Sequence, residues 1–242
     1  MLLIKNEGET ERPALTMLNS VLYFGRKNCP YSNKIRDLLK KKSKKFYYIK
    51  SNFIGEKIDE KKIKNLTFDY IFCFRSFYIL KKNLIEKCKI APINFHPGPP
   101  EYRGIGCVNY AFYDNSKFYG CCAHIINEKI DNGKILNVRK FRLKSSDTIE
   151  SCLTKTYNLM LGQAFYVINL LCKNPDNLQK LINKNKKIKW SKKIKKLKKL
   201  NNLYEIKKSA SKKEILNKIR ATNTKNFKPY VILHNKKFIL NE

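Results

Sequence analysis

The residues best suited to chemistry lie in the stretch NFHPGPPEYRGIG, residues 94–106. Asn94 and His96 are two positions apart, so on a β-strand both side chains point from the same face toward one reacting atom. A side-chain amide can donate a hydrogen bond to a developing oxyanion. An imidazole that titrates near neutrality can accept or return a proton. The alternative is a polar pair that only satisfies backbone groups at a strand end.

A third polar group follows in KIDNGKI, where Asp131 precedes Asn132 and Gly133. The Asn-Gly pair allows the chain to turn sharply, so this carboxylate can approach the strand end from a separate loop. There it can orient an imidazole or hold a water molecule that carries protons. Asn94, His96 and Asp131 therefore form the candidate catalytic set.

The loop after His96 combines stiff and permissive residues. Its prolines fix φ and lower the entropy lost on ordering, whereas its glycines allow conformations that other residues resist. These residues are Pro97, Pro99 and Pro100, and Gly98, Gly104 and Gly106. The composition predicts a loop of preset shape that forms a wall beside the candidate catalytic set.

Alternating strands and helices must position these groups. Apolar runs predict strands at 21–24, ending at Gly25, and at 45–52, 68–74, 91–95, 119–128 and 134–143. Amphipathic segments predict helices at 32–42, 59–66, 81–88 and 107–115. This order predicts an α/β fold with a Rossmann-like, parallel-core sheet and helices on both faces.

The second half of the chain begins with the longest predicted helix, which ends near residue 173 and is capped by Ser146 or Asp147. A short helix at 212–221 and a β-hairpin with the turn Asn235-Lys236 follow as a small C-terminal appendage. We expect a flexible extension at 1–18, a catalytic domain at 19–173, and a Lys-rich linker, helix and hairpin at 174–242. The run 183–199 is expected to be a solvated linker whose few apolar groups pack on the core.

Composition narrows the functional class. The 242 residues are 43% hydrophobic, which suffices for a sizeable core, and the formal net charge is +33. Lysine supplies 44 of the 52 basic residues, whereas nucleic-acid readers rely more on arginine, so a compositional bias explains the charge better than nucleic-acid binding. The eight cysteines form no C-x-x-C pair, so we expect reduced thiols and no metal. No apolar run resembles a signal peptide or membrane span, which predicts a cytoplasmic protein.

Three ordered segments resemble the folate-dependent formyltransferase superfamily over residues 19–172: DYIFCFRSFYI, INFHPGPPEYRGIG and YGCCAHIINEKIDNGKIL. The resemblance implies formyl transfer from N10-formyltetrahydrofolate to an amine, with Asn94, His96 and Asp131 in the catalytic roles. It also implies that the pterin lies against the main chain of two segments. Their residues are Arg75, Ser76, Phe77, Tyr78 and Ile79, and Asn127, Glu128, Lys129 and Ile130.

Within that superfamily, the proline-rich loop, FGRKNCPYS and the tail with IKW, IRAT and PYV are similar to the sugar N-formyltransferases. The implied acceptor is a dTDP-linked amino sugar such as dTDP-4-amino-4,6-dideoxyglucose, used for surface glycan (O-antigen type, lipopolysaccharide) synthesis by a homodimer. A pyrophosphate needs cations or backbone donors. Candidate substrate contacts are Arg26, Lys27, Pro97, Gly98, Tyr102, Arg103 and Gly104.

Other assignments stay open at this point. The acceptor could be glycinamide ribonucleotide or methionyl-tRNA, or the chain could be a non-enzymatic, basic RNA-binding protein. The amine position (3 or 4) and the nucleotide base are not readable from the sequence. His124, in the strand CCAHIIN, is expected to be a structural histidine.

Overall fold

The computed structural model describes residues 17–57 and 59–240 and places a six-stranded sheet at its centre, in the order β2-β1-β3-β4-β6-β7. The strands are β1 (Leu18–Arg26), β2 (Ser43–Ser51), β3 (Phe68–Phe74), β4 (Cys88–His96), β6 (Phe118–Ile125) and β7 (Ile135–Arg142). The first four pair in parallel, whereas β6 and β7 are antiparallel to their neighbours. The predicted α/β, Rossmann-like sheet with a parallel core is confirmed, and its far edge is antiparallel.

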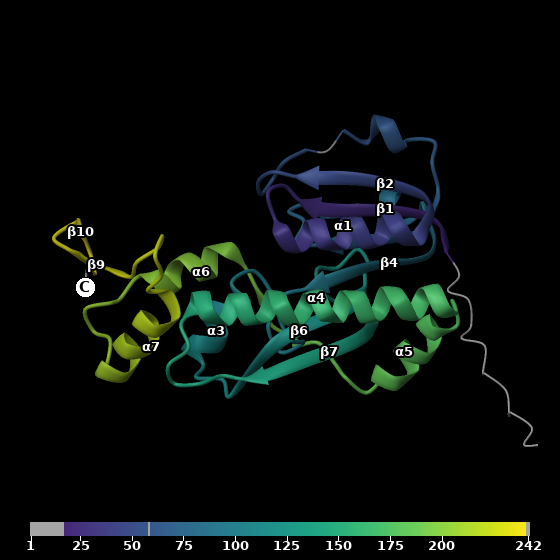
Figure 1. Cartoon of the computed structure of the whole chain (residues 1–242). Coiled ribbons are helices and arrows are strands. Elements are labelled where there is room, and N and C mark those ends of the chain that lie inside the picture. The colour runs from purple at the N-terminus through teal and green to yellow at the C-terminus, as the bar shows by residue number, and fades with distance from the viewer. Residues whose placement is uncertain (1–16, 58, 241–242) are drawn as a thin grey trace, which may run out of the picture.

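Helices cover both faces of this sheet. On one face, α1 (Pro30–Lys42) and α4 (Ile149–Lys173) pack on the inner residues of β1, β3 and β4 (Figure 1). On the other face, the short helices η1 (Glu60–Ile63) and α2 (Lys82–Ile85) contribute Ile63 and Leu84 to a second cluster. Because both faces are buried, β1 and β3 carry continuous apolar runs instead of alternating patterns.

Gly25 continues β1 instead of ending it, contrary to the sequence expectation. A Cβ atom at this position would lie 2.3 Å from the Ser32 hydroxyl oxygen. That hydroxyl also bonds the Tyr23 hydroxyl at 2.7 Å and accepts from the Arg26 amide at 2.9 Å. The glycine therefore allows α1 to approach the strand closely.

The C-terminal elements gather beyond α3 (Cys107–Tyr113), at one end of the molecule (Figure 1). They are α6 (Leu197–Tyr204), α7 (Lys212–Thr222) and the hairpin of β9 (Tyr230–Leu233) and β10 (Lys236–Ile239). α5 (Asn177–Asn185) packs instead near β7. The domain boundary near residue 174 stays a prediction, and most of the extension expected at 1–18 lies outside the described residues.

The run 183–199 is more than a solvated linker. Its lysines are mostly exposed, as expected, but β8 (Ile194–Lys195) pairs in parallel with β5 (Arg103–Gly104) in the proline-rich loop. The pairing joins two segments about ninety residues apart in the chain. Sequence periodicity cannot reveal a two-residue bridge of this kind, because it leaves no repeating pattern.

Two local predictions were wrong in detail. Thr148 caps α4 in a reciprocal capping box with Ser151, while the expected cap Asp147 accepts a bond from the Lys144 amide at 2.8 Å. The hairpin turn is His234-Asn235, one residue earlier than expected, and both residues have positive φ (45° and 60°). That conformation matches the twist of two-residue hairpin loops.

Two glycines offer a matched test of the packing. Gly120 lies on β6, where a Cβ atom would come within 1.9 Å of the Arg139 carbonyl oxygen, so Gly120→Ala should cost about 1–3 kcal/mol in unfolding free energy. Gly162 is inside α4 and faces only the tip of the Arg139 side chain, so Gly162→Ala should add about 0.5–1 kcal/mol. Urea unfolding measures both values, and equal effects would contradict the close strand contact.

Candidate active site

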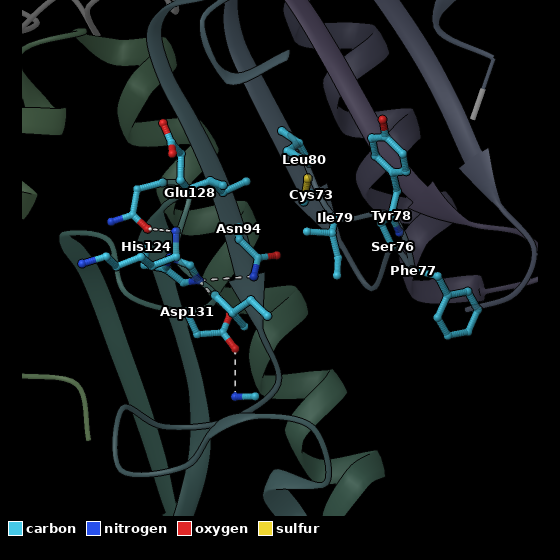
Figure 2. Close-up of a pocket in the computed structure, with 15 residues that line it drawn as sticks. Cys73, Ser76, Phe77, Tyr78, Ile79, Leu80, Asn94, His124, Glu128 and Asp131 are labelled. Carbon is cyan, nitrogen blue, oxygen red and sulfur yellow. Dashed lines mark hydrogen bonds and ion pairs between the residues drawn. The ribbon is translucent and has the colours of Figure 1, made fainter. Parts of the chain in front are cut away.

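Four polar side chains meet where β4 ends. Asn94 and His96 lie on the same face of β4, as alternation predicts, and register places His124 of β6 directly opposite Asn94. Asp131 arrives from the turn after β6 and stands between the two histidines. Its Oδ2 lies 3.5 Å from His96 Nδ1, and its Oδ1 lies 3.5 Å from His124 Nε2. Figure 2 shows Asn94, His124 and Asp131 side by side at this position.

Hydrogen bonds define the orientation of the Asn94 amide. His124 Nδ1 lies 2.8 Å from the Ile125 carbonyl oxygen, so this nitrogen carries a proton. The Asn94 amide nitrogen lies 3.2 Å from His124 Nε2, the ring nitrogen that also faces Asp131. The amide keeps a second N–H for another partner.

The turn that carries Asp131 is strained and closely packed. Asp131 has a positive φ of 42°, which a residue with a side chain rarely adopts. Two positions later, a Cβ atom on Gly133 would lie 1.8 Å from the Ile125 carbonyl oxygen. Because only glycine tolerates that approach, Gly133 is required to return the chain against the end of β6.

Burial and charge together set the ionisation of the His96–Asp131 pair. Burial alone would lower the pKa of His96, but the Asp131 carboxylate and Cys107 outweigh it and raise the pKa to about 9. Burial would likewise raise the pKa of Asp131, but His96, His124 and the Gly104 amide hold it well below its usual range. His96 is therefore an imidazolium at neutral pH, which corrects the expectation that it titrates near neutrality.

A cavity of about 260 Å³ opens beside this cluster. Asn94, His124 and Asp131 contribute to its lining, whereas His96 is not among the lining residues and contacts Asp131. His96 Nε2 faces the Tyr102 carbonyl oxygen at 3.2 Å and Cys107 Sγ at 3.6 Å. A molecule in the cavity would thus meet the amide and the carboxylate directly, and the imidazolium through the carboxylate.

Most of the residues expected to contact the cofactor line this cavity from two sides (Figure 2). Residues 76–79 form one wall and residues 127–130 form the opposite wall. Arg75 differs, because its guanidinium lies 3.7 Å from the centre of the Tyr157 ring and Nη1 contacts Cys29 Sγ at 3.3 Å. Binding by these residues stays a prediction.

The residues expected to contact the acceptor are more scattered. Arg26 lies over the Phe77 ring at 3.8 Å, next to the cavity, and Lys27 is exposed. The Gly104 amide donates to Asp131 Oδ2 at 2.9 Å. Gly98 packs so closely that a Cβ atom would lie 2.8 Å from His96 Nε2.

Pro97, Tyr102 and Arg103 hold the loop together. The Pro97 carbonyl accepts from the Tyr119 hydroxyl at 2.8 Å, and Tyr102 packs on the Tyr119 ring at 6.2 Å. Arg103 is only 5% exposed and donates to Asn132 and to two backbone carbonyls. These contacts within the protein bury the guanidinium, and its expected role as a cation for a pyrophosphate stays a prediction.

Sequence reasoning missed two residues of the site. His124 was expected to be structural, yet it touches both Asn94 and Asp131, because β4 and β6 pair in a register that places it opposite Asn94. Trp190, the only tryptophan, comes from the Lys-rich run and packs edge-on against His124, with ring centres 4.9 Å apart. The sequence offered one signal for Trp190: it is the single tryptophan of the chain, and it lies in the IKW segment that is similar to the sugar N-formyltransferases.

The comparisons with known proteins agree with this geometry. A protein-family model described as "Formyl transferase" matches residues 20–160, which is more than half of the chain. The chain belongs to the formyl transferase family. This membership favours an enzyme over a non-enzymatic RNA-binding protein. Among the described residues, no cluster of three or more His, Cys, Asp or Glu could hold a metal, and no helix is long and apolar enough to cross a membrane.

Relatives within the family differ in how much of the chain they share. Methionyl-tRNA formyltransferase of Ehrlichia ruminantium is 31% identical over 121 residues, which cover 50% of this chain but only 39% of that enzyme. The 4-N formyltransferase of Francisella tularensis is 19% identical, with a TM-score of 0.65 over 91% of this chain and 96% of that one. The N-formyltransferase of Helicobacter canadensis, solved with folinic acid and dTDP-3-aminofucose, is 18% identical with a TM-score of 0.63 over 90% and 85%. At these identities the two structures establish a shared fold.

The contact between His96 and Asp131 leads to a prediction about how His96 titrates. In Asp131→Asn the favourable charge is lost while burial remains, so the pKa of His96 should fall from about 9 to below its ordinary value of 6.5. The stabilisation from the raised His96 pKa is present below about pH 6.5 and is lost as the pH rises through 9. The stabilisation from the lowered Asp131 pKa is present above 3.8 and is lost on acidification. NMR titration of the ring protons checks this, and a wild-type His96 that titrates near 6.5 would contradict it.

Proposed function

We propose that this formyl transferase moves a formyl group from N10-formyltetrahydrofolate to the amine of a nucleotide-linked amino sugar. The observation that carries the proposal is the placement of Asn94 and Asp131 in the lining of one cavity, backed by the His96 imidazolium. The preferred acceptor is dTDP-4-amino-4,6-dideoxyglucose or a close relative, for the synthesis of surface glycans such as the O-antigen of lipopolysaccharide. A cytoplasmic location belongs to the same proposal.

The cavity suits a flat ring such as a pterin. Its opposite walls carry two large apolar side chains that are unusually exposed, Ile79 at 68% and Ile130 at 51%. Apolar groups on both sides can cover the two faces of a ring, while the main chain of 127–130 can bond its polar edge. The bound folate supplies the formyl carbon that the amine attacks.

The side chains have separate tasks in this reaction. The free N–H of Asn94 donates to the oxygen that becomes negative as the amine attacks the formyl carbon. Asp131 accepts a hydrogen bond from the amine or from a bridging water, and the imidazolium of His96 behind it balances its charge. The proton that the amine loses and the proton that N10 gains can pass through this pair, which is unchanged after each turnover.

Two arginines can supply the positive charge that binds a phosphorylated acceptor. Arg26 at the end of β1 and Arg75 after β3 sit at the carboxyl ends of neighbouring parallel strands, where α/β sheets bind ligands. Each lies on an aromatic ring, and within the described residues neither has an ion pair with a carboxylate. Burial, followed by the charge of Arg75, lowers the pKa of Arg26. Two like charges held together without a counter-ion favour an anionic ligand such as a pyrophosphate.

The share of the chain that aligns with each relative also favours a sugar nucleotide as the acceptor. The two solved neighbours align with about nine-tenths of this chain, 91% and 90%, whereas the sequence match to the tRNA enzyme covers 50% of it. One neighbour is a 4-N formyltransferase and the other binds a 3-aminofucose nucleotide, so the proposal extends to either amine position. Methionyl-tRNA is the second candidate acceptor, favoured by the sequence matches and by the net charge of +33.

A homodimer is part of the proposal. Among the described residues, β9 and β10 pair with each other, and β9 adds a single bridge from Tyr230 to Glu205. Ile232, Phe238 and Ile239 are each at least 43% exposed. An isolated two-stranded hairpin is at best marginally stable in water. A second copy that covers these apolar groups would stabilise it.

The reaction can be tested with a panel of acceptors. The purified protein is incubated with N10-formyltetrahydrofolate and dTDP-linked 3- and 4-amino sugars, glycinamide ribonucleotide or methionyl-tRNA, and mass spectrometry detects the product. We expect one formyl group on one dTDP-amino sugar. Asn94→Ala should lower kcat by about 10²–10³-fold, while Asn158→Ala on the exposed face of α4 should have no effect.

Transfer to methionyl-tRNA alone would replace the proposed acceptor. Full activity in Asn94→Ala would remove the oxyanion role.

The arginine pair predicts a specific kinetic change. Arg26→Met and Arg75→Met each remove a charged donor, so KM for the nucleotide sugar should rise about tenfold while KM for the folate stays unchanged. Arg36→Met is the control, because Arg36 pairs with Asp37 on α1. A rise confined to KM for the folate would assign the arginines to the glutamate carboxylates of the cofactor instead.

A further inference from the structure

The strained turn that carries Asp131 is held from outside by two residues, Arg103 and Trp190. The Arg103 guanidinium donates to Asn132 Oδ1 at 3.1 Å and to the Ile130 carbonyl, on either side of Asp131. Trp190 Nε1 donates to the Gly133 carbonyl at 2.7 Å. Three of the four positions in the turn, residues 130–133, are thus bonded by the same two side chains.

Arg103 and Trp190 are themselves locked together. Arg103 also donates to the Ser191 carbonyl at 3.3 Å, and the Ser191 amide donates to the Pro100 carbonyl at 2.9 Å. The β5–β8 pairing continues this contact, with the Ile105 amide bonded to the Lys195 carbonyl at 2.9 Å. The proline-rich loop and the Lys-rich run therefore form one unit around the turn.

The burial of Arg103 is costly and calls for a reason. The residue is 5% exposed, and its partners are an amide oxygen and carbonyls; within the part of the chain that the structure describes, it forms no ion pair with a carboxylate. Burying an ion without a counter-charge opposes folding. Two of its three hydrogen bonds go to one turn, which has a positive φ at Asp131 and does not prefer its conformation by itself.

Trp190 also closes the rear of the site. Its ring meets His124 edge-on with centres 4.9 Å apart and His96 with centres 6.1 Å apart. The indole thus packs against both histidine rings. An apolar cover at this place keeps water from the charged pair and strengthens its interaction.

We propose that Arg103 and Trp190 are positioning residues that hold the Asp131 carboxylate between His96 and His124. Neither touches the folate cavity, and both act through the turn at residues 130–133. The kinetic part of this inference rests on the proposed formyl transfer, whereas the placement of the carboxylate does not. The C-terminal segment thereby belongs to the catalytic unit.

The test removes single hydrogen-bond donors. Trp190→Phe keeps an aromatic ring but loses the N–H, Arg103→Met loses the guanidinium, and Arg103→Lys can restore one bond. If the carboxylate moves by about 1 Å, kcat should fall about 10–100-fold while both KM values change less than about twofold. Arg103→Lys should recover part of the loss. Arg142→Met, at an exposed arginine of β7, is the control.

NMR titration of His96 supplies a readout that needs no substrate. As the carboxylate loosens, the pKa of His96 should fall from about 9 toward 6.5 in Trp190→Phe and Arg103→Met, but not in Arg142→Met. A lower Tm with unchanged kcat and unchanged His96 pKa would show a merely structural role and overturn the proposal. Should Arg103→Met fail to fold, the same result in Trp190→Phe decides. A fall in this pKa in a protein that formylates no acceptor would sink the proposed function but keep the positioning role.

Discussion

The buried contact between Asp131 and His96 is the interaction on which the rest of the site depends. Each group is unfavourable in this place by itself, because burial opposes the charge of both. Together they stabilise each other's ionised forms, at 3.5 Å and in a dry environment. The neighbouring backbone positions this pair. The end of β4 presents the imidazole, the turn presents the carboxylate, and the Gly104 amide donates to Oδ2, the carboxylate oxygen that faces His96.

The fold places the pair at a border between two kinds of strand pairing. The parallel strands β1, β3 and β4 bring Arg26, Arg75 and Asn94 together at their carboxyl ends. The antiparallel strand β6 then returns beside β4, which puts His124 opposite Asn94 and the turn above both.

Particular residues show how far the sequence could be interpreted. Asn94 and His96 share a face because side chains alternate along any strand, and the tight Asp-Asn-Gly turn follows from local chemistry, so both could be predicted. His124, Trp190 and Arg103 could not. Their roles depend on the β4–β6 register and on a two-residue bridge between distant segments, and neither has a periodic signal. The ionisation predicted for His96 was wrong for the same reason, because the pKa of this side chain depends on which charge lies next to it after folding.

The sequence by itself determined the alternation of strands and helices, the α/β class, the candidate catalytic set and the resemblance to formyltransferases, because these depend on local periodicity and on residue types at short spacing. Tertiary structure alone decided which second histidine joins the set, that the C-terminal run covers it, and that Arg103 is buried in the loop. These features depend on contacts between segments far apart in the chain. Their geometry exists only once the backbone hydrogen bonds and the core have fixed one register and one arrangement of elements.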